Sequence, residues 1–458
     1  MEQVRDVVIP EALEGAMSRQ AQAERGGEFT FPAFGQHGVF RTANGRELLM
    51  QKRAGRAGRT NSWKARGYEA LPIAEVCSAV IKRMQKKPFP TTGPNWKQVA
   101  IFLGLTFGLT YLLDLILYLT SGYGQNAATA LLLQVQMLIP ATVAIALRLF
   151  AFRNNPLYRL QERPRWFLYF YLAFVLLYVA IAASAVLVPN QTSQILTSLL
   201  AQLLMVVGLV VLVALRLASG KKAFQRAGLS GGKLRHYLLF GLLFIALYTA
   251  MTGLNALFGL GHAVDVRELL SQAAGEQAAG LEMIPDWALL LLIGFQSLVL
   301  GPLLGLLIAF GEEYGWRGYL QGELVKMGKV RGILLLGVIW GLWHAPVIMM
   351  GHNYPGYPFW GVGLMTLYTV ALAFVIGYAV LKSGSVWLAA FLHALNNQAA
   401  SFLMTMIYMP DDPVFSFGVG LYGLAVWAVV VAALLILDRK EWTTPVEPSL
   451  PEAEAAEL

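Results

Sequence analysis

Cysteine is almost absent from this chain of 458 residues, which contains only Cys77, in a polar N-terminal region. A single cysteine excludes a disulfide framework and any zinc site built from several cysteines, and it gives a cysteine nucleophile little support. Charged residues are also scarce, at 14% of the sequence, whereas about a quarter of the residues of a soluble domain are charged. These shortages indicate that lipid surrounds much of the chain.

Apolar residues are what the sequence has in excess, at 57% of the total. They gather in stretches of about 20 residues, the length of helix that crosses a bilayer core of about 30 Å. We therefore predict an all-α fold, a polytopic transmembrane helical bundle of about ten spans. The predicted spans, read between polar breaks, are 98–119, 127–151, 166–188, 195–217, 237–258, 287–310, 331–350, 361–382, 385–408 and 413–437.

The run that begins at Trp287 is too long for one span, and Gly301-Pro302 interrupts it. Because proline breaks or kinks a helix, we expect a second helix to begin at Pro302 and to carry Glu312 and Glu313 deeper into the membrane. In the alternative, a helix ends near Phe310 at the cytoplasmic face.

Basic residues determine the predicted topology. The net charge is +8, and Lys and Arg collect before the first span, in the connections 153–165 and 220–236, and after the last span. Counted through ten spans, these segments all fall on one side, which the positive-inside rule makes the cytoplasmic side. Both termini are thus predicted to be cytoplasmic, and the basic N-terminal segment is expected to lie against anionic lipid, with no nucleic-acid partner.

Composition divides the chain into five regions. We expect a polar, basic, largely disordered region at 1–95, N-terminal transmembrane helices at 96–286, a helical core at 287–410, a last transmembrane helix at 411–440 and an acidic disordered tail at 441–458. The chain is accordingly predicted to be a multi-pass integral membrane protein, located in the plasma membrane if its source is prokaryotic.

Ionisable side chains at membrane depth are costly, and by default they are functional candidates. The first cluster reads Gly-Glu312-Glu313-Tyr-Gly-Trp-Arg317. Glu313 and Arg317 are four residues apart with the acid first, which favours a helical ion pair. Glu312, rotated about 100° around the helix, is left without a partner and could serve as a general base or acid. In the alternative, the cluster is ordinary solvated charge at the cytoplasmic interface.

Two further clusters lie on later predicted spans. Trp340 precedes His344 by four residues, and His393 precedes Asn397 by four, so each pair shares one helix face. The structural alternatives are a hydrogen-bonded core histidine, tryptophans that only pack, and a polar contact that holds two helices together. Taken together, a surplus carboxylate, two histidines and an amide on three helices are the inventory of a hydrolytic site. A carboxylate and an imidazole can deprotonate a water, while a second imidazole and an amide can stabilise an oxyanion or complete a metal shell.

These motifs, in this order, resemble those of the CPBP family. That family comprises type II CAAX prenyl proteases and bacteriocin-processing or self-immunity membrane proteins, also called Abi. The resemblance covers roughly residues 287–410, and this chain departs from the family at Trp340, where Phe is usual. It implies a catalytic cavity within the membrane that opens toward the cytoplasm.

The resemblance also implies roles for the residues. Glu312 and His344 would activate the attacking water, while His393 and Asn397 would bind a metal or the oxyanion. Structural or substrate-orienting roles would fall to the other motif residues, which are Glu313, Arg317 and Trp340. Zinc held by the four catalytic residues is one expectation, although Asn is an uncommon ligand and the His-Glu-x-x-His pattern is absent. A metal-free, glutamate-dependent mechanism would use the same residues.

The function that the resemblance implies is that of an intramembrane endopeptidase, a metalloprotease-like hydrolase acting on a lipidated or membrane-associated peptide. An apolar cavity between helices can accept such a chain. Two other classes stay open. One is a non-catalytic bacteriocin self-immunity protein or membrane scaffold that keeps the motifs as polar contacts. The other is a transporter, which broken helices favour, but no repeat relates the ten spans and the polar residues concentrate in three late helices.

Overall fold

The computed structural model describes residues 93–445, apart from 121, 125, 153–163 and 275–282, together with five short strands nearer the N-terminus. The chain divides into two units, Met1–Pro90 and Thr91–Leu458. In the first unit, the strands form one sheet in the order β1-β3-β4-β5-β2, in which β1 is parallel to β3 and the other neighbours are antiparallel. They are β1 (Val7–Val8), β2 (Glu28–Thr30), β3 (His37–Arg41), β4 (Glu47–Lys52) and β5 (Ser62–Ala65). They lie within the segment predicted at 1–95, most of whose other residues lie outside the described ones, as does most of the predicted tail.

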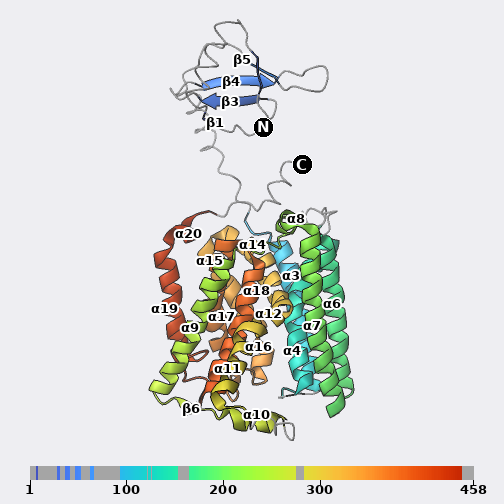
Figure 1. Cartoon of the computed structure of the whole chain (residues 1–458), viewed down its shortest axis with the longest axis vertical. Helices are drawn as coiled ribbons and strands as arrows, with labels where there is room; N and C mark the ends of the chain where they lie inside the picture. Colours follow the sequence, from blue (N-terminus) through green and yellow to red (C-terminus); the bar gives the residue numbers. More distant parts are fainter. Residues whose placement is uncertain are drawn as a thin grey trace. The chain divides into compact units, whose positions relative to one another are not determined.

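The second unit is built almost entirely of helices (Figure 1). In chain order they are α3 (Trp96–Leu119), α4 (Ala127–Ala146), α6 (Pro164–Leu187), α7 (Gln191–Ser219), α8 (Lys221–Arg226), α9 (Leu234–Leu257), α10 (Val266–Ala274), α11 (Asp286–Phe295), α12 (Gly301–Leu304), α13 (Leu306–Glu313), α14 (Gln321–Leu324), α15 (Lys329–Trp343), α16 (Ala345–Met349), α17 (Pro358–Ser383), α18 (Val386–Ser401), α19 (Leu421–Leu437) and α20 (Arg439–Thr443). Two short strands, β6 (Gly261–Ala263) and β7 (Tyr408–Pro410), pair antiparallel. The predicted all-α polytopic bundle is confirmed by this unit.

Length and composition allow seven helical stretches among the described residues to cross a membrane. They are α3, α4 with its π-helical end, α6, α7, α9, the run Asp286–Leu304 and α17. The predicted interruption at Gly301-Pro302 is confirmed, because α12 starts at Gly301 after a π-helical turn and has Pro302 in its first turn. After Gly305, α13 carries the two glutamates into the core.

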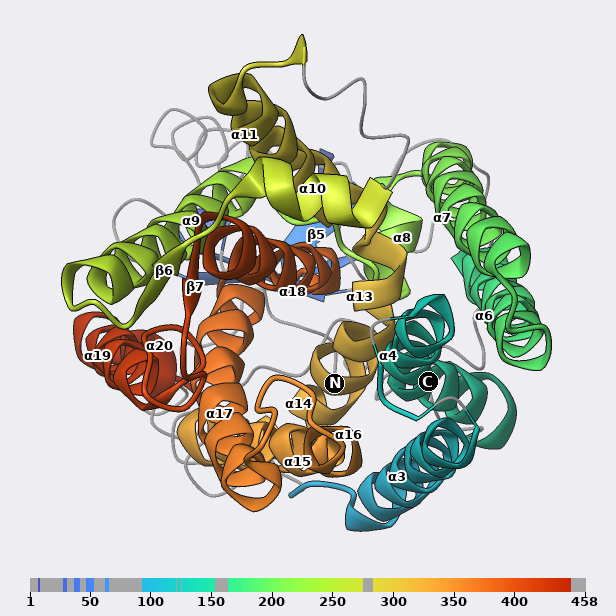
Figure 2. The same ribbon diagram turned by 90° about the horizontal axis from the view of Figure 1, so that it is seen from below.

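The later predicted spans are more broken than their apolar runs suggest. The span predicted at 331–350 is divided at His344 between α15 and α16, and Pro346 occupies the first turn of α16. The span predicted at 413–437 becomes regular helix only at Leu421. Irregular backbone at membrane depth is tolerated where protein covers it. The bundle has both covered and outer helices: α18 lies in the interior of the unit, whereas α6 and α7 lie at its edge (Figure 2).

Two pairs of glycines bring the central helices into direct contact. Gly311 and Gly315 face α4, where an added Cβ on either would come within 2.4 Å of an atom of that helix. Gly337 and Gly341 of α15 pack in the same way against α17. Small residues four apart permit such close approach between membrane helices. Other faces of α13 and α15 are thereby left for larger, polar side chains.

Candidate active site

The polar side chains of α13, α15 and α18 meet in the interior of the helical unit. Glu312 and Glu313 end α13, and Arg317 lies in the π-helical turn Tyr314–Leu320 that follows. All three are buried, with at most 4% of each residue exposed. The alternative in which this cluster is solvated charge at an interface is therefore wrong. A π-helical turn is rare and is frequently found at functional sites.

Glu313 joins Arg317 to His393. Its Oε1 accepts a hydrogen bond from Arg317 Nη1 at 2.8 Å and another from His393 Nδ1 at 2.8 Å. The ion pair predicted between Glu313 and Arg317 is thus confirmed, and both side chains are fully buried. Because His393 donates its Nδ1–H to Glu313, its second ring nitrogen, Nε2, carries no proton in the neutral ring and can accept a hydrogen bond.

Glu312 is held by Trp340 and faces His393. Its Oε2 accepts a hydrogen bond from the indole Nε1–H of Trp340 at 2.6 Å, and its Oε1 lies 3.9 Å from His393 Nε2. That separation is too long for a hydrogen bond, and it places both atoms within reach of a single bridging water. The expectation that Glu312 lacks a partner is wrong, because Trp340 supplies a donor.

Trp340 is the residue that links the cluster. Arg317 Cζ lies 4.2 Å from its ring centroid, a cation–π contact. The rings of His393 and His344 lie 5.5 and 6.0 Å away between centroids. A phenylalanine could make these ring contacts but could not donate to Glu312. The sequence singles out Trp340 because it lies four residues before His344. It does not predict the hydrogen bond from Trp340 to the Glu312 carboxylate.

His344 lies at the edge of the cluster. Its Nδ1–H donates to the Trp340 carbonyl at 2.8 Å, which leaves Nε2 unused. The ring is half-buried and lies edge-on to Trp343, with 4.7 Å between centroids. Trp343 is itself anchored, because its Nε1–H donates to Thr110 Oγ1 of α3 at 2.8 Å. In the described part of the chain, no hydrogen bond joins His344 to Glu312.

Asn397 is also peripheral. It shares a helix face with His393, as predicted from their spacing, but it is exposed whereas His393 is buried. Its Oδ1 accepts a hydrogen bond from Nδ2 of the buried Asn396 at 3.2 Å. Sequence reasoning missed Asn396 and two tyrosines behind it, Tyr248 and Tyr368; the one available signal was that Asn396 adjoins Asn397 in the motif.

Two donor atoms of this cluster converge. A catalytic zinc usually has three protein ligands. Glu312 Oε1 and His393 Nε2 face each other 3.9 Å apart, while Glu312 Oε2 is engaged by Trp340 and His393 Nδ1 by Glu313. Within the described ranges, no three His, Cys, Asp or Glu side chains are grouped so that they could hold a metal.

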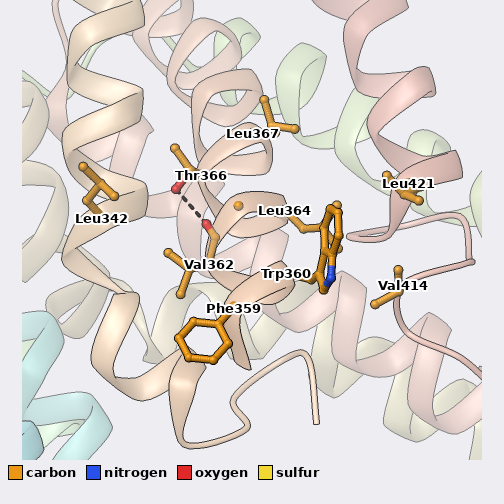
Figure 3. A pocket seen from close by; sticks show the side chains of 10 residues that line it. Leu342, Phe359, Trp360, Val362, Leu364, Thr366, Leu367, Val414 and Leu421 are labelled. Carbon is orange, nitrogen blue, oxygen red and sulfur yellow. Dashed lines mark hydrogen bonds between the residues drawn. The ribbon is translucent and has the colours of Figure 1, made fainter. Parts of the chain in front are cut away.

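An apolar pocket of about 640 Å³ lies between α15, α17 and the segment leading into α19 (Figure 3). In Figure 3, the Trp360 side chain stands between Leu364 and the two residues of the C-terminal segment, Val414 and Leu421. None of the lining residues belongs to the polar cluster. The pocket can accommodate a hydrocarbon group, but it offers no group for catalysis.

Comparison with known proteins points to one family. Residues 294–399 match the family described as type II CAAX prenyl endopeptidase Rce1-like. A stretch of 142 residues is 29% identical to CAAX prenyl protease 2 of Methanococcus maripaludis, and it covers 30% of this chain and 48% of that protein. This chain therefore spans about half the length of that relative. All the motif residues from Glu312 to Asn397 lie inside the matched segment, and over this segment the resemblance to the family of type II CAAX prenyl endopeptidases is confirmed.

Proposed function

We propose that this chain is an intramembrane endopeptidase of the CAAX type, which hydrolyses a peptide bond of a lipidated or membrane-associated protein. The observation that carries the proposal is the buried carboxylate of Glu312. One of its oxygens is held by Trp340, and the other accepts no hydrogen bond from the described residues and lies 3.9 Å from His393 Nε2. This carboxylate lies in the segment that matches type II CAAX prenyl endopeptidases.

In the proposed reaction, a water lies between Glu312 Oε1 and His393 Nε2. Glu312 takes a proton from this water, and the oxygen adds to the carbonyl carbon of the scissile bond. When the C–N bond of the tetrahedral intermediate breaks, the proton held by Glu312 passes to the leaving amine. The resemblance assigns His344 to water activation. The short separation between Glu312 Oε1 and His393 Nε2 instead favours His393 as the residue that holds the attacking water with Glu312.

His344 and Asn397 are the members of the site that a substrate can reach, because one is half-buried and the other is exposed. We assign Nε2 of His344 to a hydrogen bond with the substrate, since its Nδ1–H is already given to the Trp340 carbonyl. The Asn397 amide is assigned to the carbonyl oxygen that becomes negatively charged. A donor fixed in advance at this oxygen stabilises the transition state more than the ground state.

The test is cleavage of a fluorogenic prenylated CAAX-type peptide by protein purified in detergent. Glu312→Gln keeps an acceptor for the Trp340 N–H but cannot take a proton, so the rate should fall by about 10²–10⁴-fold, the usual contribution of a general base. Glu323→Gln is the matched control, because this carboxylate lies outside the cluster and pairs with Lys326. Full activity of Glu312→Gln would overturn the assignment of the base.

An unprenylated copy of the same peptide tests the substrate class. Cleavage of both peptides at equal rates would remove the requirement for lipid, and cleavage of neither by the wild type would overturn the proposed function. The rival is a non-catalytic immunity or scaffold protein, which the full burial of the Glu313–Arg317 pair favours. In that case Glu312→Leu should lower the melting temperature in detergent, because it leaves the buried Trp340 N–H without its acceptor.

Metal dependence needs its own measurement. We propose the metal-free mechanism, because only two donor atoms of the cluster converge. Full activity of protein shown to contain no bound metal, with no effect of a chelator, would support it. One zinc per chain together with activity that a chelator removes and zinc restores would overturn it.

A further inference from the structure

A buried hydrogen-bonded triad lies behind Asn397. It consists of Tyr248 of α9, Tyr368 of α17 and Asn396 of α18, which are exposed by 0%, 4% and 4%. The two hydroxyl oxygens are 2.5 Å apart, and they lie 2.8 and 3.0 Å from Asn396 Oδ1. Three helices therefore contribute to one polar contact in the interior of the unit.

Counting protons fixes the orientation of the Asn396 amide. The two hydroxyls carry one proton each, and Asn396 Oδ1 can only accept. The Tyr248–Tyr368 contact uses one proton at most, and among the described residues the other hydroxyl proton has no acceptor but Asn396 Oδ1, so at least one proton is donated to that oxygen. The nitrogen of Asn396 then points away from the tyrosines, and it donates to Asn397 Oδ1 at 3.2 Å.

The same logic extends one residue further, to Asn397. Its oxygen is engaged by Asn396, so its own Nδ2 is the end of the amide that remains for another partner. Asn397 is exposed, unlike the triad behind it. The amide is thereby set with its donor group, and not its acceptor, toward the side that a substrate can reach.

We propose that Tyr248, Tyr368 and Asn396 are positioning residues that hold the Asn397 amide as a hydrogen-bond donor to the substrate carbonyl oxygen. The proposal rests on the endopeptidase function given above. Asn397 donates because Asn396, held by the two tyrosines, engages its amide oxygen and leaves its amide nitrogen available. Donors fixed before the reaction need no rearrangement as charge develops on the oxygen.

Asn396→Asp is the sharpest variant. Aspartate has two acceptor oxygens, so while the tyrosines donate to one of them, the other can only accept from Asn397. The Asn397 amide must then turn over and present its oxygen to the substrate. We expect kcat to fall by roughly 10²–10³-fold, the loss seen when one oxyanion donor is removed, while KM stays within about twofold because the donor acts chiefly in the transition state.

A buried charge opposes folding, so a second variant avoids it. Tyr248→Phe combined with Tyr368→Phe removes both donors and frees the Asn396 amide to rotate, so kcat should again fall with little change in KM. Tyr354→Phe is the matched control. It also removes a buried tyrosine hydroxyl, one that donates to the Val419 carbonyl at 2.8 Å and not to Asn396. Equal kcat values for the double variant and the control would overturn the proposal.

A second readout does not depend on cleavage. In protein carrying ¹⁵N-labelled asparagine, the Asn397 side-chain amide is assigned by its absence in Asn397→Asp. In Asn396→Asp, one Asn397 amide proton should shift downfield, because it now donates to a carboxylate. An unchanged Asn397 resonance would overturn the proposal. If the wild type cleaves no peptide, the proposed function fails, and this spectrum still decides the orientation of the amide.

Discussion

Helices α7 and α17 are similar in length and composition but differ in surroundings. They contain 29 and 26 residues, and the most apolar 18-residue stretches of the two helices have mean hydropathies of 2.7 and 2.1. Yet 11% of that stretch is buried in the protein in α7, against 67% in α17. On α7 the contact face consists of a few small or apolar residues, such as Ala201 and Gly208. On α17 the neighbours α15, α18 and α19 cover most of the surface.

The difference shows that apolar length identifies a helix that can cross a membrane but not where it lies in the bundle. Polar side chains locate the centre, because an ion pair such as Glu313–Arg317 is stable at membrane depth only when protein surrounds it. Substitutions in α13, α15 and their partners should therefore have large effects, and those in lipid-facing helices or at exposed ends should have small ones.

Arg317→Met should have the largest effect. It leaves Glu313 buried with His393 as its one remaining hydrogen-bond partner among the described residues, and breaking a buried ion pair from one side costs about 3–5 kcal/mol. The matched control is Lys382→Met, which removes an ion pair with Asp438 whose side chains are 37% and 29% exposed. Such a pair contributes about 0–1 kcal/mol. Unfolding in detergent should separate the two variants, and equal destabilisation would contradict the contrast between centre and edge.

Trp340→Phe should come next, as a loss of rate together with a loss of stability, because a buried acceptor is left without its donor. The ring contacts to Arg317 and His393 remain, but Glu312 Oε2 loses its donor. A hydrogen bond to a charged group contributes about 1.5–3 kcal/mol, which corresponds to a fall in kcat of roughly 10–100-fold if it acts in the transition state.

The control for this change is Trp442→Phe. Trp442 is also buried, and its Nε1–H donates to the Leu434 carbonyl at 2.9 Å and not to a residue of the cluster. Trp442→Phe should therefore leave kcat unchanged in the peptide assay. A Trp340→Phe protein with the activity of the wild type would show that the indole N–H does not position Glu312, and that Phe, the usual residue of the family, serves equally well here.

The sequence alone predicts those contacts of the site that join residues of one helix. The pair Glu313–Arg317 is an example, because residues four apart on a helix meet whatever surrounds them. The contact from Trp340 to Glu312 joins two helices and depends on how α13 and α15 pack, which spacing along the chain does not specify. The triad behind Asn397 is hidden for the same reason, since its members come from three helices.

In the fold, too, some features could be predicted from the sequence and others could not. Apolar runs were enough to predict the helical bundle, and Pro302 was enough to place the start of a helix near residue 301. The break at His344 was not predicted, because the apolar run continues through it and Pro346, which lies in the first turn of α16, was not used to place a helix start. The late start of α19 at Leu421 was missed as well, since the segment before it is apolar but is occupied by a buried turn.

Gly311→Ala should have the smallest of the three effects. It tests whether close packing against α4 fixes the position of α13, which carries Glu312. An added Cβ would lie 2.4 Å from the Met137 carbonyl oxygen and 2.7 Å from Leu138 Cα. Both are backbone atoms of α4, so the helix itself must move, and overpacking of this kind costs about 1–3 kcal/mol. The control is Gly108→Ala on α3, where a Cβ meets nothing within 4 Å. Because alanine is the better helix former, the control should match the wild type or be slightly more stable.

This pair of variants also separates packing from catalysis. If α4 holds α13 in place, Gly311→Ala should lower both the melting temperature and kcat, because Glu312 adjoins Gly311 on a helix that has been displaced. Equal stability of the two variants would mean that α4 yields easily at this contact. The close packing of α13 on α4 would then not be what fixes the carboxylate, and the hydrogen bond from Trp340 would have to position Glu312 unaided.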